Sequence, residues 1–139
     1  MIMRQIGIVG SSRVTPDYLE RAKKMVVNIL EQYHQDDTQI VSGGNTGKKG
    51  TYGIDYIAEF IAKDMGYNTL IFHPKTKDWN GYKARNLQIA GTCSKVYSIA
   101  MPQLNHKSCY HCRETNNTHS KTAGCWTAHH CSNWELRVL

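Results

Sequence analysis

Four short apolar segments, each followed by a turn sequence, constrain the fold of this chain more than any other feature. They are Gln5–Val9, Gln39–Ser42, Asn68–Phe72 and Lys95–Ala100, and Glu135–Leu139 is a candidate fifth. Short runs without regular polar alternation are typical of strands that are buried on both faces of a sheet. Glycine or proline follows each of the first four within two residues, as expected where a strand ends.

Stretches with a helical repeat of apolar residues separate these segments. The first begins with a threonine, a proline and an aspartate at 15–17, a pattern typical of a helix N-terminus. The second has Gly66 at the position where a helix of this length should end. In order, the sequence predicts helices after Asp17, over Ile54–Met65, near Lys83–Ala90 with Gly91 as its end, and over Gly124–Asn133.

Strands that alternate with helices predict an α/β fold, with a parallel sheet of about five strands covered on both faces. Right-handed crossovers arrange such elements in a Rossmann-like three-layer sandwich. The length of 139 residues suits a single domain over residues 1–139. The polar segment at about 103–122 contains cysteines and histidines and has no strand or helix repeat, so we expect a loop insertion before the last helix.

Composition excludes several classes of protein. Hydrophobic residues make up 40% and charged residues 20%, which is ordinary for a globular protein and unlike disordered or fibrous chains. No apolar run approaches the roughly 20 residues of a membrane helix, and the first ten residues lack a signal-peptide pattern. We therefore expect a cytoplasmic protein with no membrane partner. The chain has five cysteines, an odd number, and a framework of disulfide bonds is not expected in a cytoplasmic protein.

The net charge of +6 is concentrated on the edge of the predicted sheet where ligands bind. In parallel α/β sheets the loops that follow the strands gather at the carboxyl ends of the strands. The loops at 10–17, 43–55, 73–85 and 101–123 hold ten basic residues against four acidic ones, whereas the remaining residues balance. Lysines are common in loops of every kind, so the excess favours an anionic ligand without naming it.

Glycine turns follow two of the predicted strands and precede the last predicted helix. They read Gly10-Ser11-Ser12, Ser42-Gly43-Gly44 and Ala123-Gly124. Backbone N–H groups at such turns, next to a helix N-terminus, favour a bound phosphate. These turns contain neither the G-x-G-x-x-G fingerprint of dinucleotide-binding domains nor the P-loop pattern.

A set of motifs runs through nearly the whole chain. Its members are GSSR at Gly10–Arg13, VSGG at Val41–Gly44, Gly53-Ile54-Asp55 with Ala58, Arg85-Asn86, and Ala123–Thr127. In kind and in order these motifs resemble the SLOG superfamily, which includes the DNA-processing protein DprA and the cytokinin-activating LOG phosphoribohydrolases. The similarity is greatest to its YspA-like branch of small single-domain proteins.

The resemblance implies that the protein binds or senses a nucleotide or phosphoribosyl ligand on the glycine turns. By this resemblance, one side of the ligand contacts Gly10, Ser11 and Arg13, and its phosphate lies in a cradle formed by Ser42, Gly43 and Gly44. Asp55 would hold the loop or a ribose hydroxyl, and Arg85 and Asn86 would reach the ligand from the third crossover. Gly124 and Thr127 would close the far side.

Two features depart from the family pattern. The loop between Gly44 and Gly53 is longer than usual. LOG enzymes carry P-G-G-x-G-T-x-x-E, whereas this chain reads TAGCWTAHH, with His130 about where the glutamate falls. A neutral imidazole can act as a base, but it cannot replace a carboxylate that faces an oxocarbenium-like centre. Binding or sensing is therefore favoured, and a nucleoside-5′-monophosphate phosphoribohydrolase is the enzymatic alternative.

A third alternative is a nucleic-acid-binding protein of the DprA kind. The basic loops would then contact the backbone, and Trp79 would stack on a base. The same side chain is equally well explained as a cap on the core. The sequence does not fix the oligomeric state, and a homo-oligomer is among the candidates.

The cysteine- and histidine-containing segment includes a zinc-like spacing at Cys109 and Cys112. Thiolates and imidazoles suit Zn²⁺, and His119 is the next candidate ligand. A closed structural site needs four ligands, and His106 and Cys125 are the alternatives for completing it. Zinc, in a structural role, is thus the one cofactor that the sequence suggests. Free thiols are the simpler reading of a single Cys-x-x-Cys in this compartment.

Overall fold

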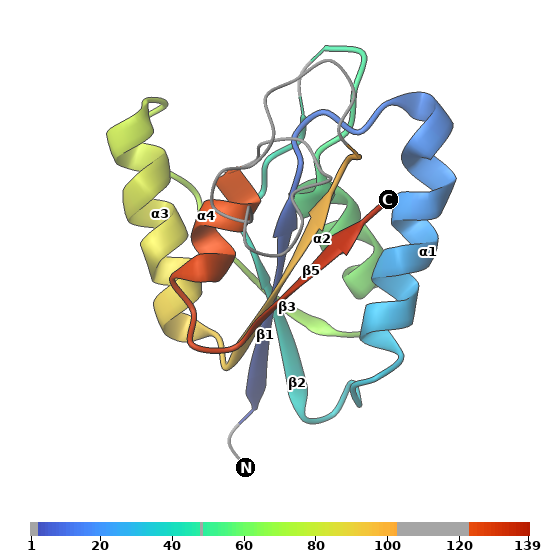
Figure 1. Ribbon diagram of the computed structural model, residues 1–139. Helices are drawn as coiled ribbons and strands as arrows, with labels where there is room; N and C mark the ends of the chain where they lie inside the picture. Colours follow the sequence, from blue (N-terminus) through green and yellow to red (C-terminus); the bar gives the residue numbers. More distant parts are fainter. Residues whose placement is uncertain (1–2, 48, 103–122) are drawn as a thin grey trace.

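The computed structural model describes residues 3–47, 49–102 and 123–139, and it confirms the α/β fold class (Figure 1). Five parallel strands form one sheet in the order β3-β2-β1-β4-β5. The strands are β1 (Arg4–Gly10), β2 (Thr38–Ser42), β3 (Asn68–Ile71), β4 (Lys95–Ala100) and β5 (Trp134–Val138). The helices are the 3-10 turn η1 (Pro16–Tyr18), α1 (Leu19–Leu30), α2 (Ile54–Asp64), α3 (Trp79–Thr92) and α4 (Ala123–His129).

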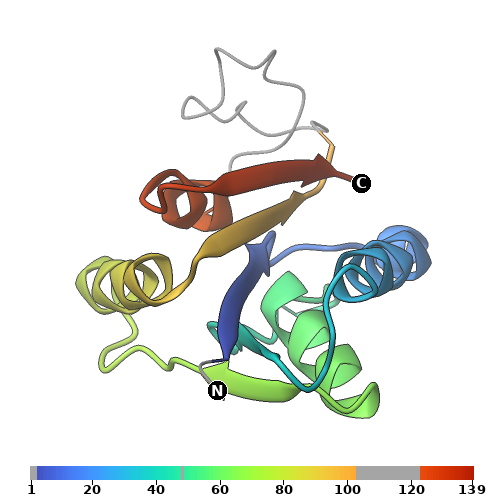
Figure 2. The ribbon, with the colours of Figure 1, turned by 90° about the horizontal axis from the view of Figure 1, so that it is seen from below.

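Two helical layers enclose the sheet. Helices α1 and α2 cover one face, and α3 and α4 cover the other (Figure 2). Side chains of β1 alternate between the two: Ile6 and Ile8 belong to the core beneath α1 and α2, whereas Val9 packs with Ile89 and Ala128 of α3 and α4. Both faces of the central strand are therefore buried, which explains why its sequence is a continuous apolar run.

Strand predictions are correct to within one residue, but two helix predictions need correction. Gly91 does not end the third helix, which continues to Thr92 and starts earlier, at Trp79. Its N-cap is Asp78, whose side chain accepts a hydrogen bond from the Gly81 amide at 2.8 Å. This bond and a second one from Thr76 lower the pKa of Asp78. The last helix ends at His129 rather than Asn133.

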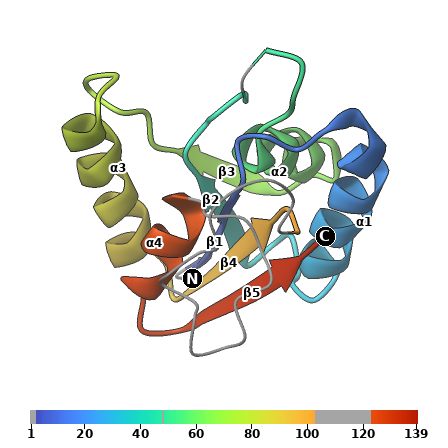
Figure 3. The same cartoon turned by 45° about the horizontal axis from the view of Figure 1, so that its top comes forward.

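The direction in which successive strands are added to the sheet reverses between β1 and β4. From β1 the chain proceeds outward to β2 and β3, then returns to the other side of β1 for β4 and β5. Ligands in sheets of this kind bind outside the carboxyl ends of the strands at such a point. Figure 3 brings that edge forward, with the loops after β1, β2 and β3. None of the described helices is long and apolar enough to cross a membrane.

Candidate functional site at the carboxyl edge of the sheet

Gly10 and Gly124 bring the end of β1 into backbone contact with the start of α4. A Cβ atom on Gly124 would lie 2.6 Å from the Cα atom of Gly10. A Cβ atom on Gly10 would overlap the carbonyl oxygen of Ile99 in β4. The structure therefore explains both glycines by close approach of neighbouring backbones.

Ser11 lies next to this contact and links three segments. Its amide donates to the carbonyl of Ile99 at 3.0 Å, and its carbonyl accepts from the amide of Ile54 at 2.9 Å. Its side-chain oxygen accepts from the amide of Met101 at 3.0 Å. Ser42 has a comparable position on β2, where its buried hydroxyl donates to the carbonyl of Ile8 at 2.6 Å. Both hydroxyls are thus hydrogen-bonded to the protein's own backbone.

Asp55, at the start of α2, is buried beneath the loops after β1 and β2 and is 7% exposed. Burial raises the pKa of this carboxyl to about 6, against the opposing effects of the Arg85 charge and the backbone amides of Asn45, Gly10 and Gly43. These amides belong to the turns that were expected to hold a phosphate. The Asp55 carboxylate therefore faces part of the predicted anion cradle.

Arg85 and Asn86 reach the same place from α3. The Arg85 guanidinium donates to the Gly43 carbonyl at 2.5 Å through Nη1 and to Asn86 Oδ1 at 2.8 Å through Nε. A Cβ atom on Gly43 would lie 2.7 Å from both Arg85 Nη1 and Asp55 Oδ2, so the two charged groups flank this glycine closely. Arg85 is 7% exposed, and its Cζ lies 5.8 Å from the Tyr82 ring centre.

Asn86 has one unpaired donor in this cluster. The residue is 4% exposed, and its Nδ2 atom has no hydrogen-bond partner among the residues that the structure describes. Buried polar atoms are nearly always hydrogen-bonded, and an exception needs an explanation such as a bound water, ion or ligand. We call Gly43, Asp55, Arg85 and Asn86 the Arg85 cluster.

The other predicted ligand residues differ in exposure. Gly44 has a positive φ of 69°, and a Cβ atom there would lie 2.9 Å from His73 Cε1. Arg13 is exposed, unlike Arg85. Thr127 is 1% exposed within α4. The structure thus gathers Gly43, Asp55, Arg85 and Asn86 into one cluster and leaves Arg13 on the surface.

His130 follows the C-terminal end of α4. Its Nδ1 atom lies 2.7 Å from the carbonyl oxygen of Trp126, and its ring centre lies 4.1 Å from that of Trp126. Gly124, which contacts β1, is near the opposite end of the helix, so the two residues are roughly 9 Å apart along its axis at the usual rise per residue.

The candidate zinc ligands Cys109, Cys112 and His119, with His106, lie outside the described residues. Cys125 is described: it is 1% exposed, with Sγ 3.4 Å from the hydroxyl of Ser98. Within ranges 3–47, 49–102 and 123–139, no three His, Cys, Asp or Glu side chains are grouped as metal ligands.

Exposed basic side chains lie in the loops after β1, β2 and β3, at the same edge of the sheet as the cluster, and at the start of α3. None of them forms an ion pair with any residue in the described part of the chain. They are Arg13, Lys49, Lys75, Lys77 and Lys83. The same loops hold two exposed acids, Asp17 and Asp78, against these five exposed cations, so positive charge is in excess at this edge.

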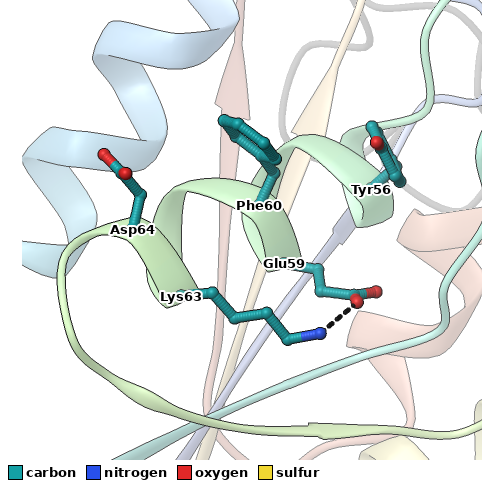
Figure 4. Close-up of a pocket in the computed structure, with 5 residues that line it drawn as sticks. All are labelled: Tyr56, Glu59, Phe60, Lys63 and Asp64. Carbon is teal, nitrogen blue, oxygen red and sulfur yellow. Dashed lines mark hydrogen bonds and ion pairs between the residues drawn. The ribbon is translucent and has the colours of Figure 1, made fainter.

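Sequence reasoning missed a second feature, an aromatic surface on α2. Tyr56 and Phe60 are 46% and 62% exposed. Figure 4 shows their side chains on the helix with Glu59, Lys63 and Asp64 around a surface pocket. The signal was present in the helical repeat, since two aromatic residues four apart fall outside the apolar face of the predicted helix.

The raised pKa of Asp55 predicts a specific pH dependence of stability. Between its unfolded pKa of about 4 and its folded pKa of about 6, the folded state holds a proton that the unfolded state has lost. The contribution of Asp55 to the free energy of unfolding should therefore fall by about 3 kcal/mol as pH rises through this range. Urea unfolding of the wild type and Asp55→Asn across this range measures it. Parallel stability curves for the two proteins would contradict the prediction.

Compared with known proteins, the chain matches no family model, no curated protein and no solved structure.

Proposed function

We propose that the protein binds a nucleotide or phosphoribosyl compound at the carboxyl edge of its sheet, as a binding or sensing domain of the SLOG kind. The single observation that carries the proposal is the unpaired, buried Nδ2 of Asn86 within the Arg85 cluster. The resemblance of the sequence motifs supplies the ligand class. The excess of positive charge at this edge of the sheet suits the phosphate group of such a ligand.

The energetics of the Arg85 cluster support a ligand-binding role. Burying two opposite charges is often no more stabilising than burying apolar side chains of the same volume. An unpaired buried amide adds a further cost, on the order of 1–3 kcal/mol. The Arg85 cluster carries both of these free-energy costs at the carboxyl edge of the sheet. A bound hydrogen-bond acceptor, such as a phosphate or ribose oxygen, lowers the cost of the unpaired amide.

The exposed cations supply the complementary long-range attraction. Lys49 and Arg13 belong to the loops after β2 and β1, and Lys75 and Lys77 to the loop after β3. Without local ion pairs, these charges raise the concentration of anions near the edge and speed their association. Phosphorylated ligands should therefore bind more strongly than their dephosphorylated counterparts.

Thermal unfolding in the presence of AMP, ribose 5-phosphate, inorganic phosphate and adenosine tests the proposal. A ligand at about one hundred times its dissociation constant should stabilise the protein by about 2.7 kcal/mol, which corresponds to about 10 °C at this chain length. The shift should be larger for AMP than for adenosine. No shift with any phosphorylated compound would refute the proposal.

Asn86→Asp is the matched variant. The new carboxylate keeps an acceptor for Arg85 Nε and removes the unpaired donor. Without ligand it should melt below the wild type, because the buried carboxylate adds a second negative charge to the Arg85 cluster and leaves one oxygen without a donor, and with AMP it should show no shift. An undiminished AMP shift in this variant would place the ligand elsewhere.

The phosphoribohydrolase alternative makes a separate prediction. If the protein hydrolyses AMP, incubation must release free adenine, which chromatography detects. We expect none, because His130 replaces the glutamate of the LOG motif and lies at the far end of α4 from Gly124.

Single-stranded nucleic acid is a second candidate ligand, favoured by exposed aromatic rings among the lysines at the start of α3. Trp79 is 51% exposed and Tyr82 is 36% exposed, with Lys77 and Lys83 nearby in sequence. Rings interleaved with cations suit base stacking and backbone contacts. Binding would weaken steeply with salt and would be reduced by Trp79→Ala. No binding to an oligonucleotide at low salt would exclude it.

A further inference from the structure

The outer surface of α2 carries an aromatic ridge that the proposed ligand site does not use. It consists of Tyr52, which precedes the helix, and of Tyr56 and Phe60 on the helix itself, and their exposed fractions are 39%, 46% and 62%. The rings of Tyr56 and Phe60 stack with their centres 6.5 Å apart and their planes inclined at 30°. Exposed apolar side chains are unremarkable singly, but a contiguous group marks an interaction surface.

The ridge lies between two grooves. One has a volume of about 420 Å³ and is lined by Tyr56, Glu59, Phe60, Lys63 and Asp64 (Figure 4). The other, towards α1, has a volume of about 200 Å³ and is lined by Leu19, Lys23, Tyr52, Tyr56, Ile57, Phe60 and Ile61. A ridge of large side chains with a groove on each side is the surface form through which helices pack against helices.

Charges around the ridge balance, in contrast to those of the whole chain. Glu59 and Lys63 form an ion pair at 2.7 Å, and the grooves add one further acid, Asp64, and one further base, Lys23. The chain as a whole carries +6. A neutral surface with both signs does not attract a polyanion, and it allows two copies of a basic chain to approach without repulsion.

We propose that this surface of α2 is the interface of a two-fold symmetric homodimer. In a two-fold contact each residue pair occurs twice, so the surface must be complementary to itself. Antiparallel α2 helices that cross beside Ile61 place Glu59 of each copy opposite Lys63 of the other. The Phe60 rings of the two copies then lie side by side near the two-fold axis, because position 60 of each helix faces position 62 of the other. Helix α3 lies on the other face of the sheet from α2 and remains accessible (Figure 2).

Sedimentation velocity over a range of protein concentrations measures the proposed association. The wild type should be a dimer at about 100 µM and dissociate on dilution. Phe60→Glu should raise the dissociation constant at least about tenfold with an unchanged melting temperature for the monomer, because the side chain is 62% exposed. A wild type that stays monomeric at the highest concentration would overturn the proposal.

Leu87→Glu is the matched control. It makes the same kind of change at a 43% exposed position on α3, across the sheet, and should leave the dimer intact. If Leu87→Glu dissociates the dimer and Phe60→Glu does not, the interface lies on the other face and the proposal is wrong.

Charge reversal distinguishes contacts between copies from the ion pair within one helix. Glu59→Lys and Lys63→Glu should each weaken self-association, because like charges then meet across the interface. An equimolar mixture of the two variants should form heterodimers, since two opposite-charge pairs are restored between the copies. Failure of the mixture to associate more strongly than either variant alone would contradict the antiparallel arrangement. Ligand binding by the dissociated variants tests the edge site independently.

Discussion

Gly10→Ala is expected to destabilise the protein severely. The added Cβ atom would overlap the carbonyl oxygen of Ile99 and lie 2.9 Å from its carbonyl carbon. Both atoms are backbone, and Gly10 pairs with Ile99 in the β1–β4 ladder, so neither strand can move without breaking the centre of the sheet. A loss of at least about 4 kcal/mol follows, which is a large part of the stability of a typical domain. Circular dichroism with urea unfolding measures it.

Alanine substitutions at two other glycines serve as comparisons for Gly10→Ala. Gly124→Ala should also destabilise the protein, by less, because α4 is able to shift from the Gly10 backbone that its Cβ would meet at 2.6 Å. Gly91→Ala should stabilise by about 0.5–1 kcal/mol, since no atom lies within 4 Å of its Cβ position within α3. A Gly10→Ala protein with the urea midpoint of the wild type would show that the two backbones do not approach as described.

Arg85→Met is expected to cost about 3–5 kcal/mol at neutral pH, because it removes the positive charge beside the buried Asp55 carboxyl and leaves the Gly43 carbonyl and Asn86 Oδ1 without their donor. The pKa of Asp55 should rise further, since the Arg85 charge is the largest effect that opposes burial. The loss should therefore shrink at pH below about 6, where Asp55 in the wild type is protonated as well. Urea unfolding at several pH values tests both statements.

A double-mutant cycle isolates the contribution of the charge. Adding Asp55→Asn to Arg85→Met should cost less than the sum of the single changes, because no unpaired charge is then buried. Arg13→Met is the control: the residue is exposed, and its replacement should change the free energy of unfolding by less than about 0.5 kcal/mol. Equal effects of the two arginine variants would refute the role given to Arg85.

Apolar periodicity was sufficient to predict the sheet and two of the helices. Buried parallel strands consist of nearly continuous apolar residues, so their ends are marked clearly by glycine and proline. The bounds of helix α3 were not predicted correctly, because its inward face includes Gly81, Arg85 and Asn86, which interrupt the apolar repeat. Its true start was marked by Asp78, a capping residue, and its supposed end at Gly91 is an exposed position where glycine is merely tolerated.

At the site, sequence order predicted which loops would meet but not what their polar groups would contact. Ser42 satisfies the Ile8 carbonyl instead of facing the edge, and Asp55 turns towards the amides of Gly43 and Asn45. The Asp55 contact to Asn45 depends on the loop that follows Gly44, and Tyr52 in that loop forms a bridge to Val14. Tertiary placement of this kind leaves no periodic signal in the sequence.

The change of direction beside β1 also determines how late in folding the sheet can be completed. Ser94 donates to the carbonyl of Gln5, 89 positions earlier, and β4 pairs with β1 along its length. Closing so long a segment costs chain entropy before the contacts that repay it have formed. We expect refolding in milliseconds to seconds rather than microseconds, with the β1–β2–β3 half able to form first from contacts closer in sequence.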